Sequence, residues 1–260
     1  MQKEVLIIIP AYNEEKNISK VLDRLEQPEI AEFADILVMN DASSDNTNWI
    51  VKARHHAVVT HVFNLGYGSA LQLGYKYAIR CNYRYVIQMD ADGQHDAGNL
   101  INLYRALKTP DENGVYPDIV LGSRYLNDSP YFETSALKRF AFFLFRHIIK
   151  WSTGRTIMDP TTGLQGLSRR AALCYSKFGN FDEKYPDANM ITNMLLSDFN
   201  IVEIPAAMHL REHGKSMHSG LKPIGYMFHM FFSILAVLIR QKIFKNVPKA
   251  ERYNNDIQKP

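Results

Sequence analysis

Residues 85–95 read YVIQMDADGQH, and this stretch carries the clearest signal of the fold. The apolar run Tyr85–Met89 ends in two carboxylates, Asp90 and Asp92, which are separated by Ala91. A short apolar run that stops at a polar cluster is typical of a buried strand followed by a loop. The stretch therefore predicts an interior strand whose carboxyl end opens onto a polar site.

Similar runs recur on both sides of this strand and alternate with helical patterns. The runs that we interpret as strands are Val5–Ile9, Ile36–Met39, Val58–Phe63 and Ile119–Leu121. Strands that alternate with helices predict an α/β fold, in which helices flank a mostly parallel, Rossmann-like sheet. Ligands of such sheets bind at the carboxyl ends of the strands. Polar residues gather at these ends, namely Asn13 and Glu14, Asp41, Asn64, Asp90 and Asp92, and Ser123 and Arg124.

The chain changes character after residue 130. Residues 136–151 read ALKRFAFFLFRHIIKW, a helical pattern in which basic residues are interspersed among aromatic ones. One further short strand is expected at Ile201–Ile204, and residues 223–239 carry no formal charge. We therefore divide the chain into a domain at 1–220 with halves at 1–130 and 131–220, an amphipathic or hydrophobic helix at 221–245, and a polar tail at 246–260.

Composition and charge exclude several classes of protein. Hydrophobic residues are 46% and charged residues 22% of the 260, the balance of a globular protein rather than a disordered one. Cys81 and Cys174 lie far apart, so we expect a reducing, cytosolic compartment and no disulfide scaffold or zinc cluster. Residues 1–130 carry 12 Lys and Arg against 17 Asp and Glu, whereas residues 131–260 carry 18 against 10. The acidic half suits a metal ion and the basic half suits phosphate or an anionic membrane, and no nucleic-acid partner is expected.

The carboxylates after the central strand could bind a metal ion, or they could be part of an ordinary turn. Two carboxylates at i and i+2 can converge on one cation, and Mg²⁺ typically takes one or two carboxylates plus phosphate oxygens. Asp92 and Gly93 are equally a common turn signal, so the pair alone supports either interpretation. Gly66 and Gly68 invite a dinucleotide-binding interpretation, but Leu71 stands where the third glycine would be.

Three other polar residues at strand ends have similar alternatives. Glu14 and Asp41 could cap helices, or they could accept hydrogen bonds from a nucleobase or a ribose. Arg124 follows a strand-ending Gly-Ser and suits bidentate recognition of phosphate.

Five motifs in a fixed order extend this interpretation. They are Pro10-Ala-Tyr12-Asn13-Glu14, Asn40-Asp41-x-Ser43, Asn64-x-Gly66-x-Gly68-x-Ala70-x-x-x-Gly74, Asp90-x-Asp92-x-Gln94-His95 and Gly122-Ser-Arg124. Over about residues 4–220 the chain resembles family 2 glycosyltransferases, most closely the branch of dolichol-phosphate mannose synthase and bacterial polyprenyl-phosphate glycosyltransferases. The resemblance implies the GT-A fold, with a nucleotide-sugar and metal half at 1–130 and an acceptor half at 131–220.

The same resemblance implies roles for individual residues. Nucleotide-sugar binding falls to Pro10, Tyr12, Glu14, Asp41, Asp90, Ala91, Arg211 and Lys215, the last two in a segment expected to close over the diphosphate. Asp90, Asp92 and Gln94 would hold Mg²⁺ or Mn²⁺, and Arg124, Lys138 and Arg139 would bind the acceptor phosphate. The implied catalytic residues are Asp159, Asp92 and Arg124. The segment Tyr185-Pro-Asp187 resembles a further family segment that usually has Glu at the position of Asp187.

The implied reaction is an inverting, metal-dependent transfer of a sugar from a UDP- or GDP-linked donor to undecaprenyl or dolichyl phosphate. A phosphate monoester has a second pKa near ~6 and is ionised at neutral pH, so Asp159 would then orient rather than deprotonate the acceptor. The hydroxyl of a lipid-linked or cell-wall glycan is an alternative acceptor, for which Asp159 would be the leading base. A third hypothesis is a non-catalytic nucleotide-sugar sensor or scaffold, and the intact Asp90, Asp92 and Gln94 set counts against it.

The uncharged run at 223–239 bears on localisation. As a helix it would span about 25 Å, which is shorter than the ~30 Å hydrocarbon core of a bilayer. Basic residues follow the run, so we expect an interfacial helix on the cytoplasmic face of the membrane and a peripheral protein. A buried or oligomer-forming helix is the alternative, and a homo-oligomer is compatible with the sequence.

Overall fold

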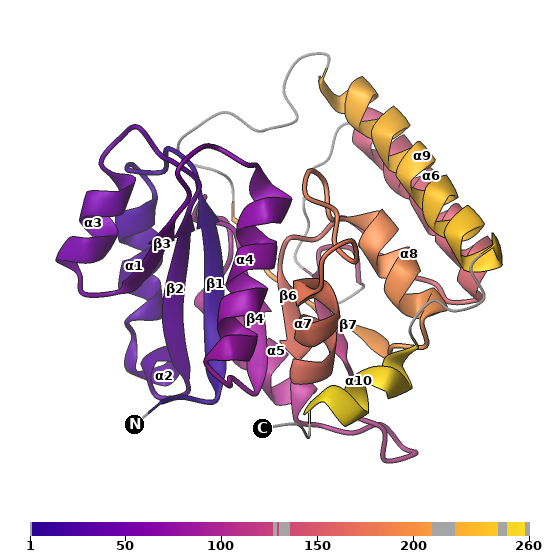
Figure 1. The fold of residues 1–260 in the computed structure, drawn as a ribbon, viewed down its shortest axis with the longest axis horizontal. Coiled ribbons are helices and arrows are strands. Elements are labelled where there is room, and N and C mark those ends of the chain that lie inside the picture. Colours follow the sequence, from indigo (N-terminus) through magenta and orange to yellow (C-terminus); the bar gives the residue numbers. More distant parts are fainter. Residues whose placement is uncertain (1, 127–128, 130–135, 210–221, 244–248, 258–260) are drawn as a thin grey trace.

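The computed structural model describes residues 2–126, 129, 136–209, 222–243 and 249–257. Within them a seven-stranded sheet runs through the molecule in the order β3-β2-β1-β4-β6-β5-β7 (Figure 1). The strands are β1 (Val5–Ala11), β2 (Ala34–Asn40), β3 (Ala57–Thr60), β4 (Tyr85–Gln88), β5 (Ile119–Ser123), β6 (Gln165–Ser168) and β7 (Ile201–Pro205). β6 runs antiparallel to its neighbours β4 and β5, and the other pairings are parallel. The expected mostly parallel α/β sheet is thereby confirmed.

Helices cover both faces of the sheet. One face packs against α1 (Ile18–Leu25), α2 (Pro28–Ala31), α3 (Thr47–Ala53) and α5 (Ala97–Leu107), and the other against α4 (Tyr67–Arg80) and α7 (Arg169–Ser176). Alternate side chains of β1 enter the two cores, since Leu6 and Ile8 lie in one while Ile7 and Ile9 lie in the other. This alternation follows from the two-residue period of a strand, and it explains why β1 is apolar throughout.

The second half of the chain extends one of these cores with further helices. α8 (Ala188–Leu196) packs against both α6 (Ala136–Thr153) and α9 (Lys222–Ile243), and Figure 1 shows the last two running side by side at one end of the molecule. α10 (Ala250–Ile257) packs against α7 and buries Tyr253. This helix lies inside the tail that we expected to be polar, because Ala250 and Tyr253 are three residues apart and share one face.

β6 is the strand that the sequence did not predict. Its residues are Gln165, Gly166, Leu167 and Ser168, so it lacks an apolar run although it lies inside the sheet. The buried Gln165 side chain donates to the Thr162 carbonyl at 3.1 Å, which compensates for burying a polar group. Leu107 lies 3.0 Å from where a Cβ on Gly166 would be, so the absence of a side chain lets α5 approach.

Asp118 ties together the strands β5, β6 and β7 at the edge opposite the strand-end loops. Its buried carboxylate accepts two hydrogen bonds from Arg170, at 2.7 and 2.6 Å, and one from the Asn200 backbone at 2.9 Å. Removing one partner of a buried ion pair leaves an uncompensated charge, which costs more than the loss of an exposed pair.

We predict that Arg170→Ala lowers the free energy of unfolding by about 3 kcal/mol, because the Asp118 carboxylate loses its partner. Arg84→Ala is the matched control, since Arg84 pairs with Glu4 at the surface and its side chain is 66% exposed. The control should lower the free energy of unfolding by less than about 1 kcal/mol. Urea denaturation followed by circular dichroism measures both, and equal losses would contradict the role of Asp118.

Candidate active site

The loops after β1 and β2 are joined by hydrogen bonds at the carboxyl edge of the sheet. Asn13 has a positive φ of 56° and exchanges bonds with the next loop, donating its N–H to Ser43 Oγ (3.0 Å) and accepting from the Ser44 N–H (2.9 Å). The Glu14 N–H donates to Thr47 Oγ1 at 2.9 Å. Pro10 is buried in β1 and Tyr12, just after it, is half exposed; their expected contact with a nucleotide stays a prediction.

Asp41 connects the second of these loops to the segment after β3. Its buried carboxylate accepts hydrogen bonds from the backbone N–H groups of Leu65 (2.9 Å) and Gly66 (2.8 Å) and contacts the His61 ring at 2.7 Å. In this conformation Asp41 holds the loop at 61–66 in place. Its expected contact with a nucleotide stays a prediction.

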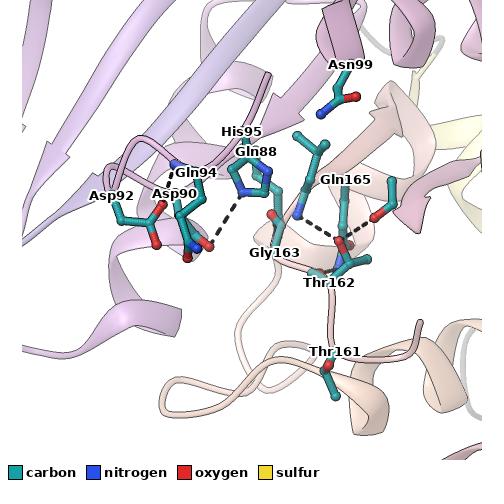
Figure 2. Close-up of polar contacts among 12 residues, drawn as sticks. Gln88, Asp90, Asp92, Gln94, His95, Asn99, Thr161, Thr162, Gly163 and Gln165 are labelled. Atoms are coloured by element: carbon teal, nitrogen blue, oxygen red, sulfur yellow. Dashed lines mark hydrogen bonds and ion pairs between the residues drawn. The ribbon is translucent and has the colours of Figure 1, made fainter. Parts of the chain in front are cut away.

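The carboxylates after β4 lie on a loop whose backbone is fixed from two sides. The Asp92 side chain accepts from the Gln94 N–H at 3.1 Å (Figure 2). Gly93, between them, has a φ of 75°. Arg24 of α1 donates to the Gly93 carbonyl at 2.7 Å. On the other side the Gln94 side chain donates to the His209 carbonyl at 3.0 Å. The loop therefore presents Asp90 and Asp92 from a defined backbone.

Three residues far apart in the sequence surround the Asp90 carboxylate. The Tyr67 hydroxyl donates to it at 2.9 Å. His95 Nε2 lies 3.8 Å from its other oxygen (Figure 2). Burial, and then the charge of Asp90, raise the pKa of Tyr67 well above its usual value, so Tyr67 stays a neutral donor. A Cβ on Gly163 would lie 2.6 Å from Asp90, so only glycine leaves room for the carboxylate.

Arg124 and Asp159 form a buried ion pair at the ends of β5 and β6. Arg124 donates through Nε and Nη2 to the two oxygens of Asp159, both at 2.7 Å, and its backbone N–H donates at 3.0 Å. Asp159 is fully buried, and its own N–H and that of Met158 donate to Glu203 on β7. Burial lowers the pKa of Arg124, but the bonds to Asp159 outweigh it and the net pKa is raised. The Arg124 guanidinium therefore carries a permanent positive charge beside the site.

A second arginine lies close to this pair. The guanidinium of Arg146, on α6, lies 5.2 Å from the centre of the Tyr125 ring, and Arg124 lies 5.4 Å from the same ring. Among the described residues the buried Nε of Arg146 has no hydrogen-bond partner. Arg139 is exposed on α6, whereas the Lys138 side chain, Arg211 and Lys215 lie outside the described residues. Sequence reasoning missed Arg146, because a basic residue in an amphipathic helix gives no signal of its own.

Asp187, which precedes α8, is a third carboxylate of the site region. Its side chain accepts a hydrogen bond from the Tyr226 hydroxyl of α9 at 2.8 Å. Burial raises the pKa of Asp187 to about 7, the Tyr226 bond opposes this shift, and the Asp90 charge adds to it. The sequence singled out the Tyr185-Pro-Asp187 segment but gave it no partner, because Tyr226 is 39 residues away.

The donor set around Asp90 and Asp92 fits a hard divalent cation. Across the described ranges, no three His, Cys, Asp or Glu side chains form a cluster that could hold a metal by themselves. Mg²⁺ and similar ions are bound by one or two carboxylates when substrate phosphates complete the shell. Asp90 and Asp92 supply such carboxylates, and Gly163 leaves the space in which Asp90 lies.

The mostly parallel sheet thus gathers paired carboxylates and an arginine at its carboxyl edge, where ligands of such sheets bind. The model of glycosyl transferase family 2 matches residues 6–175, and the chain belongs to this family. It is a glycosyltransferase of the GT-A fold.

Named relatives and a solved structure agree with this class. Polyprenol monophosphomannose synthase of Mycolicibacterium smegmatis is 27% identical over 233 residues, which cover 84% of this chain and 82% of that protein. UDP-N-acetylglucosamine–dolichyl-phosphate N-acetylglucosaminyltransferase of Methanococcus voltae is 26% identical, over 65% of this chain and 71% of that protein. Glucosyl-3-phosphoglycerate synthase of Mycobacterium tuberculosis, solved with Mn²⁺, UDP-glucose and phosphoglyceric acid, is 20% identical. It matches with a TM-score of 0.63 over 91% of this chain and 80% of that one, a likeness of fold.

We predict that Asp187→Asn makes stability less dependent on pH. The pKa of Asp187 is raised from 3.8 to about 7, so between these values the folded state binds more protons than the unfolded state. The free energy of unfolding of the wild type therefore falls as pH rises through this window, and the variant loses that contribution.

Urea denaturation at about pH 5 and pH 7.5 gives the free energy of unfolding of both proteins near the two ends of this titration. Asp45→Asn is the control: burial raises the pKa of Asp45, but hydrogen bonds from Thr47 and from the Glu15 N–H outweigh it, so the pKa is lowered and the titration lies below the window. An identical pH dependence in wild type and Asp187→Asn would contradict the raised pKa of Asp187.

Proposed function

We propose that this chain transfers a sugar from a nucleoside-diphosphate donor to a polyprenyl phosphate at the cytoplasmic face of the membrane. The observation that carries the proposal is the position of the Arg124–Asp159 ion pair. It lies at the same sheet edge as Asp90 and Asp92 and beside Phe142 of α6, a helix whose Phe145 packs against Tyr226 of α9. Transfer of a sugar to a lipid phosphate requires a binding site for the sugar donor, a fixed positive charge for the phosphate and an apolar surface for the lipid.

The donor half consists of the loops after β1, β2 and β4. Pro10, Tyr12, Glu14 and Asp41 lie where a nucleoside would bind, and Asp90, Ala91 and Asp92 lie where its diphosphate would follow. Asp90, Asp92 and Gln94 would hold Mg²⁺ or Mn²⁺, which when bound neutralises the charge on the departing diphosphate. The similar fold of glucosyl-3-phosphoglycerate synthase, solved with Mn²⁺ and UDP-glucose, supports a divalent metal at this position.

In the acceptor half Arg124 supplies positive charge, and the carboxylate of Asp159 is already paired with this arginine. Both oxygens of Asp159 accept from Arg124, so Asp159 orients the guanidinium rather than removing a proton. An ionised lipid phosphate needs no base, because its second pKa is near ~6. Arg124, with Arg139 and Arg146 on the following helix, would hold this phosphate for attack on the anomeric carbon with inversion.

Helix α9 has two faces that suit an interfacial position. Its inner face buries Tyr226, Met230 and Ile234 against the protein, whereas Phe228, Phe231, Phe232, Leu235, Ile239 and Ile243 are exposed. The segment Gly225–Ile243 is long and apolar enough to cross a membrane, with a mean hydropathy of 1.2. The hydrogen bonds that its inner side makes to Asp187, Asn189 and Ser197 favour a helix lying on the bilayer instead. Cys81 and Cys174 are both free, which fits the cytoplasmic side.

We predict label transfer to lipid when the protein is incubated with labelled UDP- or GDP-sugars, Mn²⁺ or Mg²⁺, and undecaprenyl or dolichyl phosphate. Asp92→Ala should reduce this transfer by at least about a hundredfold, because a metal-binding carboxylate is lost. Organic extraction and counting measure the product, and Asp111→Ala is the control, since Asp111 lies in the exposed turn after α5.

The negative outcomes of this assay are equally specific. Metal-dependent hydrolysis of the donor without label in the lipid would overturn the lipid acceptor and favour a glycan hydroxyl. The absence of both transfer and hydrolysis would favour a nucleotide-sugar sensor.

We also predict that replacing Phe228 and Phe232 together by Ser weakens binding to vesicles of anionic lipid by at least about tenfold. These side chains are 63% and 60% exposed on the outer face of α9, and burying one phenylalanine contributes about 2 kcal/mol. Flotation measures the effect, and Trp49→Ser is the control, because Trp49 is 70% exposed on α3, far from α9 in Figure 1. Unchanged flotation of the double variant would show that this face is not the membrane contact.

A further inference from the structure

The hydroxyl of Tyr67 joins the start of α4 to the loop that follows β4. Tyr67 is the first residue of α4, and its hydroxyl donates to Asp90 Oδ1 at 2.9 Å, across 23 residues of sequence. The side chain is partly buried and packs against the core that α4 covers. A ring that is held by packing presents its hydroxyl at a defined point, so this bond fixes one oxygen of the Asp90 carboxylate.

The backbone on both sides of Tyr67 is also held in place. Before it, the Gly66 N–H donates to Asp41 Oδ2 at 2.8 Å. After it, the Ser69 N–H donates to the Glu183 carbonyl at 3.2 Å. The start of α4 is therefore tied to the loop after β2 on one side and to the segment before α8 on the other, which leaves Tyr67 little freedom to move.

The second oxygen of Asp90 faces a competing hydrogen-bond donor. His95 Nε2 lies 3.8 Å from Asp90 Oδ2, which is longer than a hydrogen bond (Figure 2). The His95 side chain is 1% exposed, and within the described ranges neither of its ring nitrogens has a hydrogen-bond partner. A buried ring nitrogen without a partner is unfavourable, so without the Tyr67 bond a rotation of Asp90 toward His95 would be favoured.

We propose that Tyr67 is a positioning residue that holds Asp90 in place for a divalent metal and thereby sets the affinity of the site for that metal. Carboxylates that bind a metal are themselves held by hydrogen bonds, and the loss of such a bond typically weakens metal binding by ~10–100-fold. This inference rests on the proposed function, in which Asp90 and Asp92 hold the metal. It adds a residue at a position that the glycine motif Asn64-x-Gly66-x-Gly68 leaves open.

The test measures how much Mn²⁺ strengthens nucleotide binding by the full-length protein. Titration calorimetry gives the affinity for UDP and for GDP in EDTA and at increasing Mn²⁺ concentrations, without a sugar or an acceptor. In Tyr67→Phe the Mn²⁺ concentration that half-maximally strengthens binding of the preferred nucleotide should rise by about tenfold. The affinity in EDTA should change by less than about twofold, because Tyr67 acts on the metal carboxylate and not on the nucleoside.

Tyr77→Phe is the matched control. Tyr77 lies in the last turn of the same helix, and both tyrosines are partly buried against the same core. Each substitution removes one hydroxyl and keeps the ring. Tyr77→Phe should therefore leave both the Mn²⁺ dependence and the affinity in EDTA unchanged, and an equal shift in the two variants would contradict a specific role for Tyr67.

The remaining outcomes distinguish this proposal from the one on which it rests. An unchanged Mn²⁺ dependence in Tyr67→Phe, or an equal loss of affinity in EDTA and in Mn²⁺, overturns the positioning role while the donor site stands. Failure of the wild-type protein to bind either nucleotide, or binding that is the same in EDTA and in Mn²⁺, overturns the proposed metal-dependent donor site itself.

Discussion

The buried ion pair between Arg124 and Asp159 is the interaction on which the rest of the site depends. A fully buried carboxylate is unfavourable unless a cation and hydrogen-bond donors compensate it. The Asp159 carboxylate accepts three hydrogen bonds from Arg124. The backbone N–H groups of Met158 and Asp159 donate to Glu203 on β7. The ends of β5, β6 and β7 are thereby locked together. The same bonds hold a permanent positive charge where the acceptor half meets the donor half.

The carboxylates Asp90 and Asp92 are likewise held by residues from distant parts of the chain. Asp90 occupies space that Gly163 leaves free and accepts a hydrogen bond from Tyr67, so residues from β6's leading loop and from α4 decide its position. The loop that carries Asp92 is held by Arg24 and His209. Because each contact joins segments distant in the sequence, the site exists only in the folded sheet. Helix α9 adds the last layer, with one face bonded to α8 and the other exposed and aromatic.

Much of this architecture could be predicted from the sequence, and the parts that could not have physical reasons. The apolar runs predicted β1, β2, β4 and β5, because interior strands covered on both faces must be apolar. β6 could not be predicted because it has no apolar run. Gln165 is buried by hydrogen bonding to the Thr162 carbonyl, and Gly166 lets Leu107 of α5 pack directly on the strand. The motifs predicted the strand-end residues but not Tyr67, Arg146 or the Asp187–Tyr226 pair. Those contacts depend on how helices pack, which periodicity does not encode.

We propose that Asp90 and Asp92 hold a divalent metal together with the diphosphate of the donor. The most direct test is a crystal structure of the full chain with UDP and Mn²⁺, with data collected at the manganese absorption edge. We expect an anomalous peak about 2 Å from a carboxylate oxygen of this pair and in contact with the diphosphate. An anomalous peak at another place, or UDP bound away from Asp92, would contradict a metal site at this pair.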